Sequence, residues 1–353
     1  MNEITKSITF LKEYKQLKQA VDEGKTPVLA VGLSAIHKAH LAAALGLDTG
    51  RPVLVLTDDD NAANRFAADL RGFSERDIVQ LPSRELVMAD VVGVSRGYEQ
   101  RRLAALDELT EAHFAVASVQ AAAQRTMPPE ALKAAIVSLA TGETAPLDEL
   151  AQSLTRAGYE RCVQVEGTGQ FSIRGGILDV FSPGMEKPVR CEFFDDEIDS
   201  LGEFELDTQR RSRNLERALL LPAAEVLPAL GDAGAAEKLE RIAAKLEKKG
   251  GADALVKTLR GDAESLRRRI VPSGSDRVLA AVYPQKITAA DYLAPQTIVV
   301  AGESGRIAES LKGFLWQLKE DASTAFENGW LAGELAELAL SEGELTAKLG
   351  AFA

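Results

Sequence analysis

Short apolar runs separated by helical patterns fill the first third of the chain and restrict its fold more than any other feature. Four runs read as strands, over residues 28–31, 52–57, 78–82 and 114–119. They are apolar nearly throughout, which indicates strands buried on both faces. Helical patterns lie before and between them, over 4–23, 35–46, 61–73 and 98–110. This alternation predicts a parallel sheet with helices on both faces.

The middle of the chain, after the break at Pro128-Pro129, has a different pattern. A helix is predicted over 147–159. Residues 161–210 then alternate apolar and polar side chains with period two, as strands with one covered face do. Glycine and proline pairs at Gly175-Gly176 and Pro183-Gly184 suit tight turns between successive strands. We therefore predict an antiparallel, β-rich module in this part of the chain.

The last third, from about residue 217, returns to the first pattern. Lys- and Glu-rich helices are followed by two apolar runs, 278–283 and 297–302, that read as strands. We predict the α/β class, with a parallel-sheet domain in two portions, 1–126 and 217–353. The β-rich (α+β) segment 127–216, here called the β module, is inserted between them.

The residues after the first apolar run, 31-VGLSAIHKAHL-41, nearly have the spacing of a phosphate-binding loop. Gly32 and Lys38 stand as in G-x-x-x-x-G-K-[ST], but His37 replaces the second glycine and Ala39 replaces the hydroxyl residue. A histidine ring lies where the backbone must approach phosphate, and alanine has no oxygen for Mg²⁺. These residues predict a degenerate, non-functional loop. A chance match is the alternative that this stretch leaves open.

Nucleotide hydrolysis would also need an acidic pair after a second apolar strand. The run 297–302 is the best candidate, and Glu303 follows it, but Gly302 stands where an aspartate is expected. We therefore expect no catalytic residue, no ATPase activity and no nucleotide cofactor in this chain. We expect no metal site either, because the three histidines of the sequence are not spaced with a cysteine.

The balance of charge argues against broad affinity for nucleic acid. The 353 residues carry a net charge of -12, whereas sequence-independent binding to phosphates needs a basic surface. No apolar run approaches the roughly 18 residues of a membrane span, so no membrane partner is expected. Two cysteines in a chain of this length are typical of a reducing compartment. We expect a cytoplasmic protein.

The predicted strand 188-PVRCEFF-194 places unexpected residues on its outer face. Alternation puts Val189, Cys191 and Phe193 on one face and Arg190, Glu192 and Phe194 on the other. The same reasoning turns Arg174 outward in 171-FSIR-174. Arginines and an exposed aromatic, flanked by carboxylates, are typical of a protein–protein hot spot. A second covered face, with Phe194 in the core, fits the pattern equally well.

The run 169–210 closely resembles the β module that the nucleotide-excision-repair protein UvrB shares with the bacterial transcription-repair coupling factors, the Mfd proteins. The flanking parts resemble the coupling factors rather than UvrB. They carry the decayed phosphate loop, and segment 84–109 lacks the long β-hairpin with which UvrB threads damaged DNA. The resemblance runs from about Leu11 to the C-terminus. It implies a degenerate RecA/P-loop-like domain in two portions with an inserted module, as in UvrB domains 1a, 2 and 1b.

The resemblance implies a docking role. In this family the β module recruits UvrA to stalled transcription complexes. The UvrA-contacting arginines and phenylalanine of the family fall on Arg174, Arg190 and Phe194, and we expect Glu192 to hold Arg190 in position. The family is expected to mask this surface with a C-terminal domain until RNA polymerase is engaged.

The resemblance also predicts what the chain does not contain. It would be the N-terminal module of a much longer protein. The parts that bind RNA polymerase and DNA, and that use ATP and Mg²⁺ as a translocase, would lie elsewhere. The alternative function is a nucleotide- and DNA-binding repair domain like UvrB. The substitutions beside Lys38 and the short segment 84–109 favour the docking module.

Overall fold

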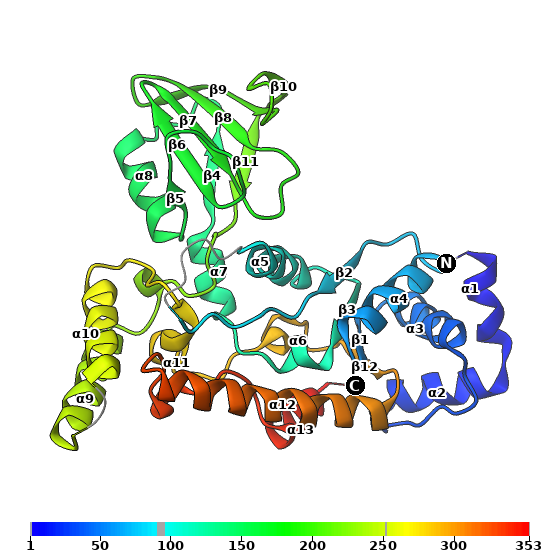
Figure 1. The fold of residues 1–353 in the computed structure, drawn as a ribbon. Helices are drawn as coiled ribbons and strands as arrows, with labels where there is room; N and C mark the ends of the chain where they lie inside the picture. The colour runs from blue at the N-terminus through cyan, green and yellow to red at the C-terminus, as the bar shows by residue number, and fades with distance from the viewer. Residues whose placement is uncertain (1, 90–95, 251–252, 353) are drawn as a thin grey trace.

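The computed structural model describes residues 2–89, 96–250 and 253–352. A parallel sheet and its helices form one body, and the strands of the β module stand apart from that body (Figure 1). Helix α7 lies where the two parts meet, and strands β4 and β11 lie with the other strands of the β module. The mixed α/β class with a parallel sheet and separate antiparallel sheets is confirmed.

The first third supplies most of the parallel sheet, which we call the body sheet. Its elements are α1 (Glu3–Ser7), η1 (Ile8–Phe10), α2 (Lys12–Asp22), α3 (Ala35–Thr49), β1 (Val53–Thr57), α4 (Asp60–Arg71), β2 (Ile78–Leu81), α5 (Gly97–Leu109), β3 (Phe114–Ser118), α6 (Val119–Ala123) and α7 (Pro129–Ala135). The strand order is β12-β1-β3-β2, with every pair parallel. Because β12 (Ile298–Ala301) comes from the last third, both α/β portions contribute to one sheet.

Strand β1 shows why the apolar runs of the sequence are continuous. Leu54 and Leu56 pack into a core cluster with α5, on one face of the body sheet. Val53 and Val55 pack into a second cluster with α3 and α4, on the other face. All five residues of β1 are buried. A strand covered on both faces has no position for a polar side chain in contact with water.

The β module contains a larger sheet, which we call the module sheet. Its elements are β4 (Val137–Ala140), α8 (Leu147–Arg156), β5 (Glu160–Arg161), β6 (Gln170–Arg174), β7 (Ile177–Phe181), β8 (Val189–Phe194), β9 (Glu197–Phe204) and β10 (Arg211–Leu215). The strand order is β10-β9-β8-β7-β6-β5. Pairing is antiparallel from β6 to β10, as expected, but β5 runs parallel to β6.

One face of the module sheet is its core face. Leu150 and Leu154 of α8 pack there with Phe171 and Leu178 of the sheet. Strand β11 (Arg217–Leu220) pairs antiparallel with β4, and its Leu220 joins the same cluster. The boundaries at 126/127 and 216/217 stay predictions. Residues beyond 216, such as Ala218 and Leu220, nevertheless pack in the core cluster of the β module.

The last third is mostly helical. Its elements are η2 (Pro228–Leu230), α9 (Ala235–Lys248), α10 (Asp253–Arg267), η3 (Ser275–Val278), α11 (Leu279–Val282), η4 (Ala289–Tyr292), β12, α12 (Ser304–Glu327), η5 (Gly333–Leu335) and α13 (Glu342–Leu349). The strand predicted over 278–283 is wrong, because these residues form the end of η3 and helix α11. They are all buried, and a short apolar run suits a buried helix as well as a strand.

The strand predicted over 28–31 is also wrong. No strand forms between α2 and α3, and the side chain of Leu29 is 82% exposed. The described parts of segment 84–109 are irregular chain and helix α5, and residues 90–95 lie outside the described residues. In the part of the chain that the structure describes, no helix has the length and apolar character needed to cross a membrane.

Candidate functional site

The segment that resembles a phosphate-binding loop does not follow a strand of the body sheet. Gly32 has a φ of 78°, and α3 begins three residues later. His37 and Lys38 therefore lie in the first turn of that helix, and Ala39 is fully buried. A functional loop connects a buried strand to its helix. Here no strand of the described chain precedes the loop, and His37 and Ala39 stand in place of the second glycine and the hydroxyl residue.

Lys38 is bound by a carboxylate rather than left free for a phosphate. Its Nζ forms an ion pair with Glu303, the residue that follows β12 and caps α12. A hydrogen bond from Lys38, together with its charge, lowers the pKa of Glu303. The structure thus brings together the lysine and the surviving acidic residue that the sequence singled out. They neutralise each other at the carboxyl end of the body sheet.

The face of the module sheet opposite its core face carries the residues predicted to dock a partner, and we call it the outer face. Asp179 of β7 is the centre of its charged contacts. Its side chain is 2% exposed. It accepts hydrogen bonds from Nε and Nη2 of Arg190 at 2.6 and 2.9 Å, and from Nη2 of Arg174 at 3.1 Å. One buried carboxylate therefore orients two arginines on neighbouring strands.

Arg190 is the more firmly held of the two arginines. Its Nη1 donates to the backbone carbonyl of Gln209 at 3.1 Å. Its guanidinium carbon lies 4.5 Å from the ring centroid of Phe204, within range of a cation–π interaction. The hydrogen bond to Asp179 raises the pKa of Arg190 above its ordinary value, more than burial lowers it. Arg190 is thus fixed and charged.

Arg174 and Phe194 are the more accessible of the predicted residues. Half of the Arg174 side chain is exposed, and Asp179 is the carboxylate that it contacts. Phe194 is 76% exposed. Alternation along β8 puts Phe193 against the core cluster and turns Phe194 outward, and the register shift between Glu192 and Phe193 leaves the extra residue, Asp199, on β9. The interpretation of Phe194 as a core residue is therefore wrong.

Glu192 does not hold Arg190 as expected. Its Oε2 accepts a hydrogen bond from Ser200 Oγ at 2.8 Å, and its Oε1 lies 4.0 Å from Arg211. Asp179 performs the expected function instead. Sequence analysis missed Asp179. The signal that could have found it is the aspartate itself, which interrupts the otherwise apolar strand 177-ILDVF-181. A carboxylate buried there needs a cationic partner.

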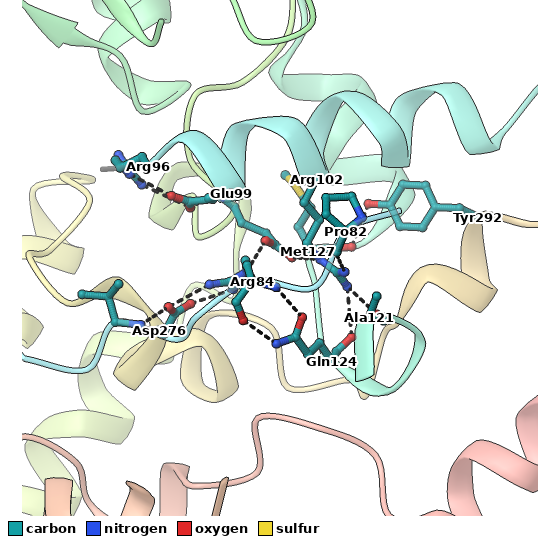
Figure 2. Close-up of polar contacts among 12 residues, drawn as sticks. Pro82, Arg84, Arg96, Glu99, Arg102, Ala121, Gln124, Met127, Asp276 and Tyr292 are labelled. Atoms are coloured by element: carbon teal, nitrogen blue, oxygen red, sulfur yellow. Dashed lines mark hydrogen bonds and ion pairs between the residues drawn. The ribbon is translucent and has the colours of Figure 1, made fainter. Parts of the chain in front are cut away.

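A second buried network fixes the chain where it returns from the β module to the body. Glu225 is fully buried and lies 2.6 Å from Arg84 Nε and 3.5 Å from Arg102 Nε. Arg84 also forms an ion pair with Asp276 at 2.7 Å and exchanges hydrogen bonds with Gln124, as Figure 2 shows. Burial alone would lower the pKa of Arg84, but Asp276 and Glu225 together raise it. Sequence analysis did not find this network.

Comparisons with known proteins find relatives both of the β module and of most of the chain. A family model described as the UvrB interaction domain matches residues 137–225, from the first residue of β4 to Glu225. The chain is 32% identical over 313 residues to the transcription-repair-coupling factor of Bacillus subtilis, covering 85% of this chain and 26% of that protein. It is homologous to the transcription-repair coupling factors. The homology covers most of the chain and therefore extends beyond the β module.

Two other coupling factors match shorter parts of the chain. Identity to the Myxococcus xanthus protein is 35% over 221 residues, covering 59% of this chain and 18% of that one. Identity to the Escherichia coli protein is 31% over 189 residues, with coverages of 53% and 16%. The chain spans about a quarter of the length of the Bacillus subtilis coupling factor.

Proposed function

We propose that this chain is the UvrA-docking module of a transcription-repair coupling factor and has no catalytic activity of its own. One observation carries the proposal. In a chain with a UvrB interaction domain, the outer face of the module sheet exposes Phe194 at the end of β8, the strand that also carries Arg190, and Asp179 already orients Arg190 and Arg174 on that face. An exposed aromatic next to fixed arginines is the composition of an interface hot spot.

The contacts within the outer face support binding rather than catalysis. Arg190 is held before any partner arrives, so less side-chain freedom is lost on association. Arg174 contacts the carboxylate of Asp179 and keeps a half-exposed side chain, so it can pair with a carboxylate of UvrA as well. Phe194 supplies the apolar contact between these charges. No residue of this face needs a cofactor to act in this way.

The body has a supporting role in this proposal. The contact between Lys38 and Glu303, with His37 and Ala39 in the loop, argues against nucleotide binding by this chain. The intact factor is expected to be a cytoplasmic, ATP-dependent DNA translocase. It would engage RNA polymerase and DNA through parts that this chain does not contain.

Calorimetric titration of the chain against purified UvrA, without nucleotide or polymerase, tests the proposal. We expect a saturable complex that Arg190→Ala weakens by about thirtyfold or more, because truncating a central arginine typically costs at least about 2 kcal/mol. A titration with Mg²⁺ and ATP forms the second arm. Absence of a UvrA complex, together with micromolar nucleotide binding, would favour the UvrB-like alternative.

A further inference from the structure

Arg211 of β10 reaches across the outer face from the edge of the module sheet. Its side chain passes over Gly202 of β9. A Cβ built on Gly202 would lie 2.6 Å from the backbone oxygen of Arg213, 2.9 Å from Nε of Arg211 and 3.2 Å from Cδ of Arg211. The first two distances are too short for a real Cβ, so any side chain at this position would have to shift both the backbone of Arg213 and the side chain of Arg211. The glycine leaves the space in which the guanidinium group lies.

The end of the Arg211 side chain is directed towards Ser200 and Glu192, which are register partners on β9 and β8. Its Nη2 donates to Ser200 Oγ at 2.8 Å, and Ser200 Oγ donates in turn to Glu192. The distance from Nη2 to Glu192 Oε1 is 4.0 Å, too long for a hydrogen bond. The Arg211 side chain is 30% exposed. Two neutral groups orient it, because its Nη1 also donates to Asn214 Oδ1 at 3.5 Å, and the exposed part of its guanidinium group remains accessible to a further carboxylate.

The register partner of Arg211 is Phe204, the residue whose ring Arg190 covers. Gly202, the residue that Arg211 covers, is the register partner of Arg190. The outer face therefore carries Arg174, Arg190 and Arg211 across the strands from β6 to β10. Two carboxylates, Asp179 and Glu192, lie among these arginines, and a third, Glu197, is the register partner of Phe194 farther along the face.

Arg213 on the same strand provides a contrast. It is the register partner of Glu203 and forms an ion pair with that residue. Glu203 is in turn the register partner of Val189, which packs in the core cluster of the module. Glu203 and Gly202 are neighbours on β9 and therefore point to opposite faces. A register shift between Arg211 and Arg213 gives these residues the partners Phe204 and Glu203, so Arg213 belongs with Glu203 to the face opposite Gly202 and Arg211.

We propose that Arg211 is a third partner-contacting arginine, which binds a carboxylate on an acidic surface of UvrA. The inference rests on the proposed function and extends its contact surface to the edge of the module sheet. The planar guanidinium group suits two parallel hydrogen bonds to a carboxylate. Electrostatic complementarity favours a carboxylate of the partner for an arginine that no described carboxylate of its own face hydrogen-bonds.

Affinities of UvrA for the parent chain, Arg211→Gln and Arg213→Gln test the inference. Each substitution removes one positive charge from β10, so the two variants are matched in charge. They differ only in the face of the sheet from which the charge is removed. We expect Arg211→Gln to lose about fivefold or more in affinity, and Arg213→Gln to stay within about twofold, as for a charge outside the contact. Raising the salt concentration should weaken the parent complex more than the Arg211→Gln complex.

The possible results separate the inference from the proposed function. If the parent binds UvrA and the two glutamine variants bind equally well, Arg211 is not a contact residue, although the docking role stands. If the parent does not bind, both proposals fail. Thermal melts establish that each variant is folded. Should Arg211→Gln unfold, Arg211→Lys serves instead, and parental affinity of the folded lysine variant would overturn the expected bidentate contact.

Discussion

Asp179 binds Arg190 through both of its carboxylate oxygens, at 2.6 and 2.9 Å, from the neighbouring strand of the module sheet. The pair lies on the outer face, where the register sets Asp179 directly opposite Arg190. This geometry fixes the plane of the guanidinium group before a partner binds. The aspartate is therefore a positioning residue, because it orients an arginine while remaining nearly inaccessible to a partner itself.

Asp179→Asn should weaken both the fold and the docking face. An amide cannot accept at two positions from Arg190, and it leaves two arginines without their anion. We expect the free energy of unfolding to fall by about 1–3 kcal/mol, the usual cost of an unsatisfied buried group. Urea denaturation measures this change. UvrA affinity should fall as well, with a larger effect at low than at high salt.

The control for this prediction is Asp199→Asn, at an exposed position of β9. It makes the same chemical change on the same sheet. We expect its unfolding free energy to remain within about 0.5 kcal/mol of the parent value, as for most surface substitutions. Equal effects of the two substitutions would show that Asp179 has no special role.

Glu225→Gln tests the buried network at the return from the β module. The substitution removes the charge between Arg84 and Arg102 without changing the side-chain size. Removal of one partner of a buried ion pair typically costs about 3–5 kcal/mol. We therefore expect a large loss of stability in urea denaturation. Glu186→Gln, at an exposed loop position of the β module, should have little effect. A Glu225→Gln variant as stable as the parent would contradict the network's structural role.

The two cysteines should differ sharply in reactivity. Burial raises the pKa of the Cys191 thiol to about 12, so almost no reactive thiolate forms at neutral pH. The pKa of Cys162 is also raised, first by burial and then by Glu160 and Glu166, but this residue is only partly buried. A thiol reagent should modify Cys162 slowly in the native chain and Cys191 only in denaturant. Rapid modification of Cys162→Ser protein would disprove the assignment of Cys191 to the core.

The body sheet could be predicted from sequence wherever both faces of a strand are covered. The runs at β1 and β3 are buried throughout, and a continuous apolar pattern follows from that burial. The run 28–31 has the same composition but remains outside the sheet. Composition reports the preference of a segment, whereas pairing depends on neighbours that are distant in the sequence. The strand predicted over residues 278–283 was wrong for a related reason, since an apolar run that is fully buried can be a helix as well as a strand.

The outer face was predicted in part. Period-two alternation placed Arg190 and Phe194 outward, and the structure agrees for both. Alternation could not identify Asp179 as the anion that holds Arg190, because that contact depends on the register between β7 and β8. The pairing of β4 with β11 was missed for the same reason. These strands are separated by most of the β module and meet only in the folded chain.

Titration of UvrA with the Phe194→Ala variant tests the docking account most directly. Phe194 is largely exposed, so its truncation should leave the thermal midpoint unchanged, whereas loss of an aromatic hot spot costs about 2 kcal/mol, or roughly thirtyfold in affinity. Lys248→Ala, in the distant helix α9, should bind as the parent does. The account predicts a folded Phe194→Ala protein with strongly reduced affinity. A folded variant that binds UvrA as tightly as the parent would contradict it.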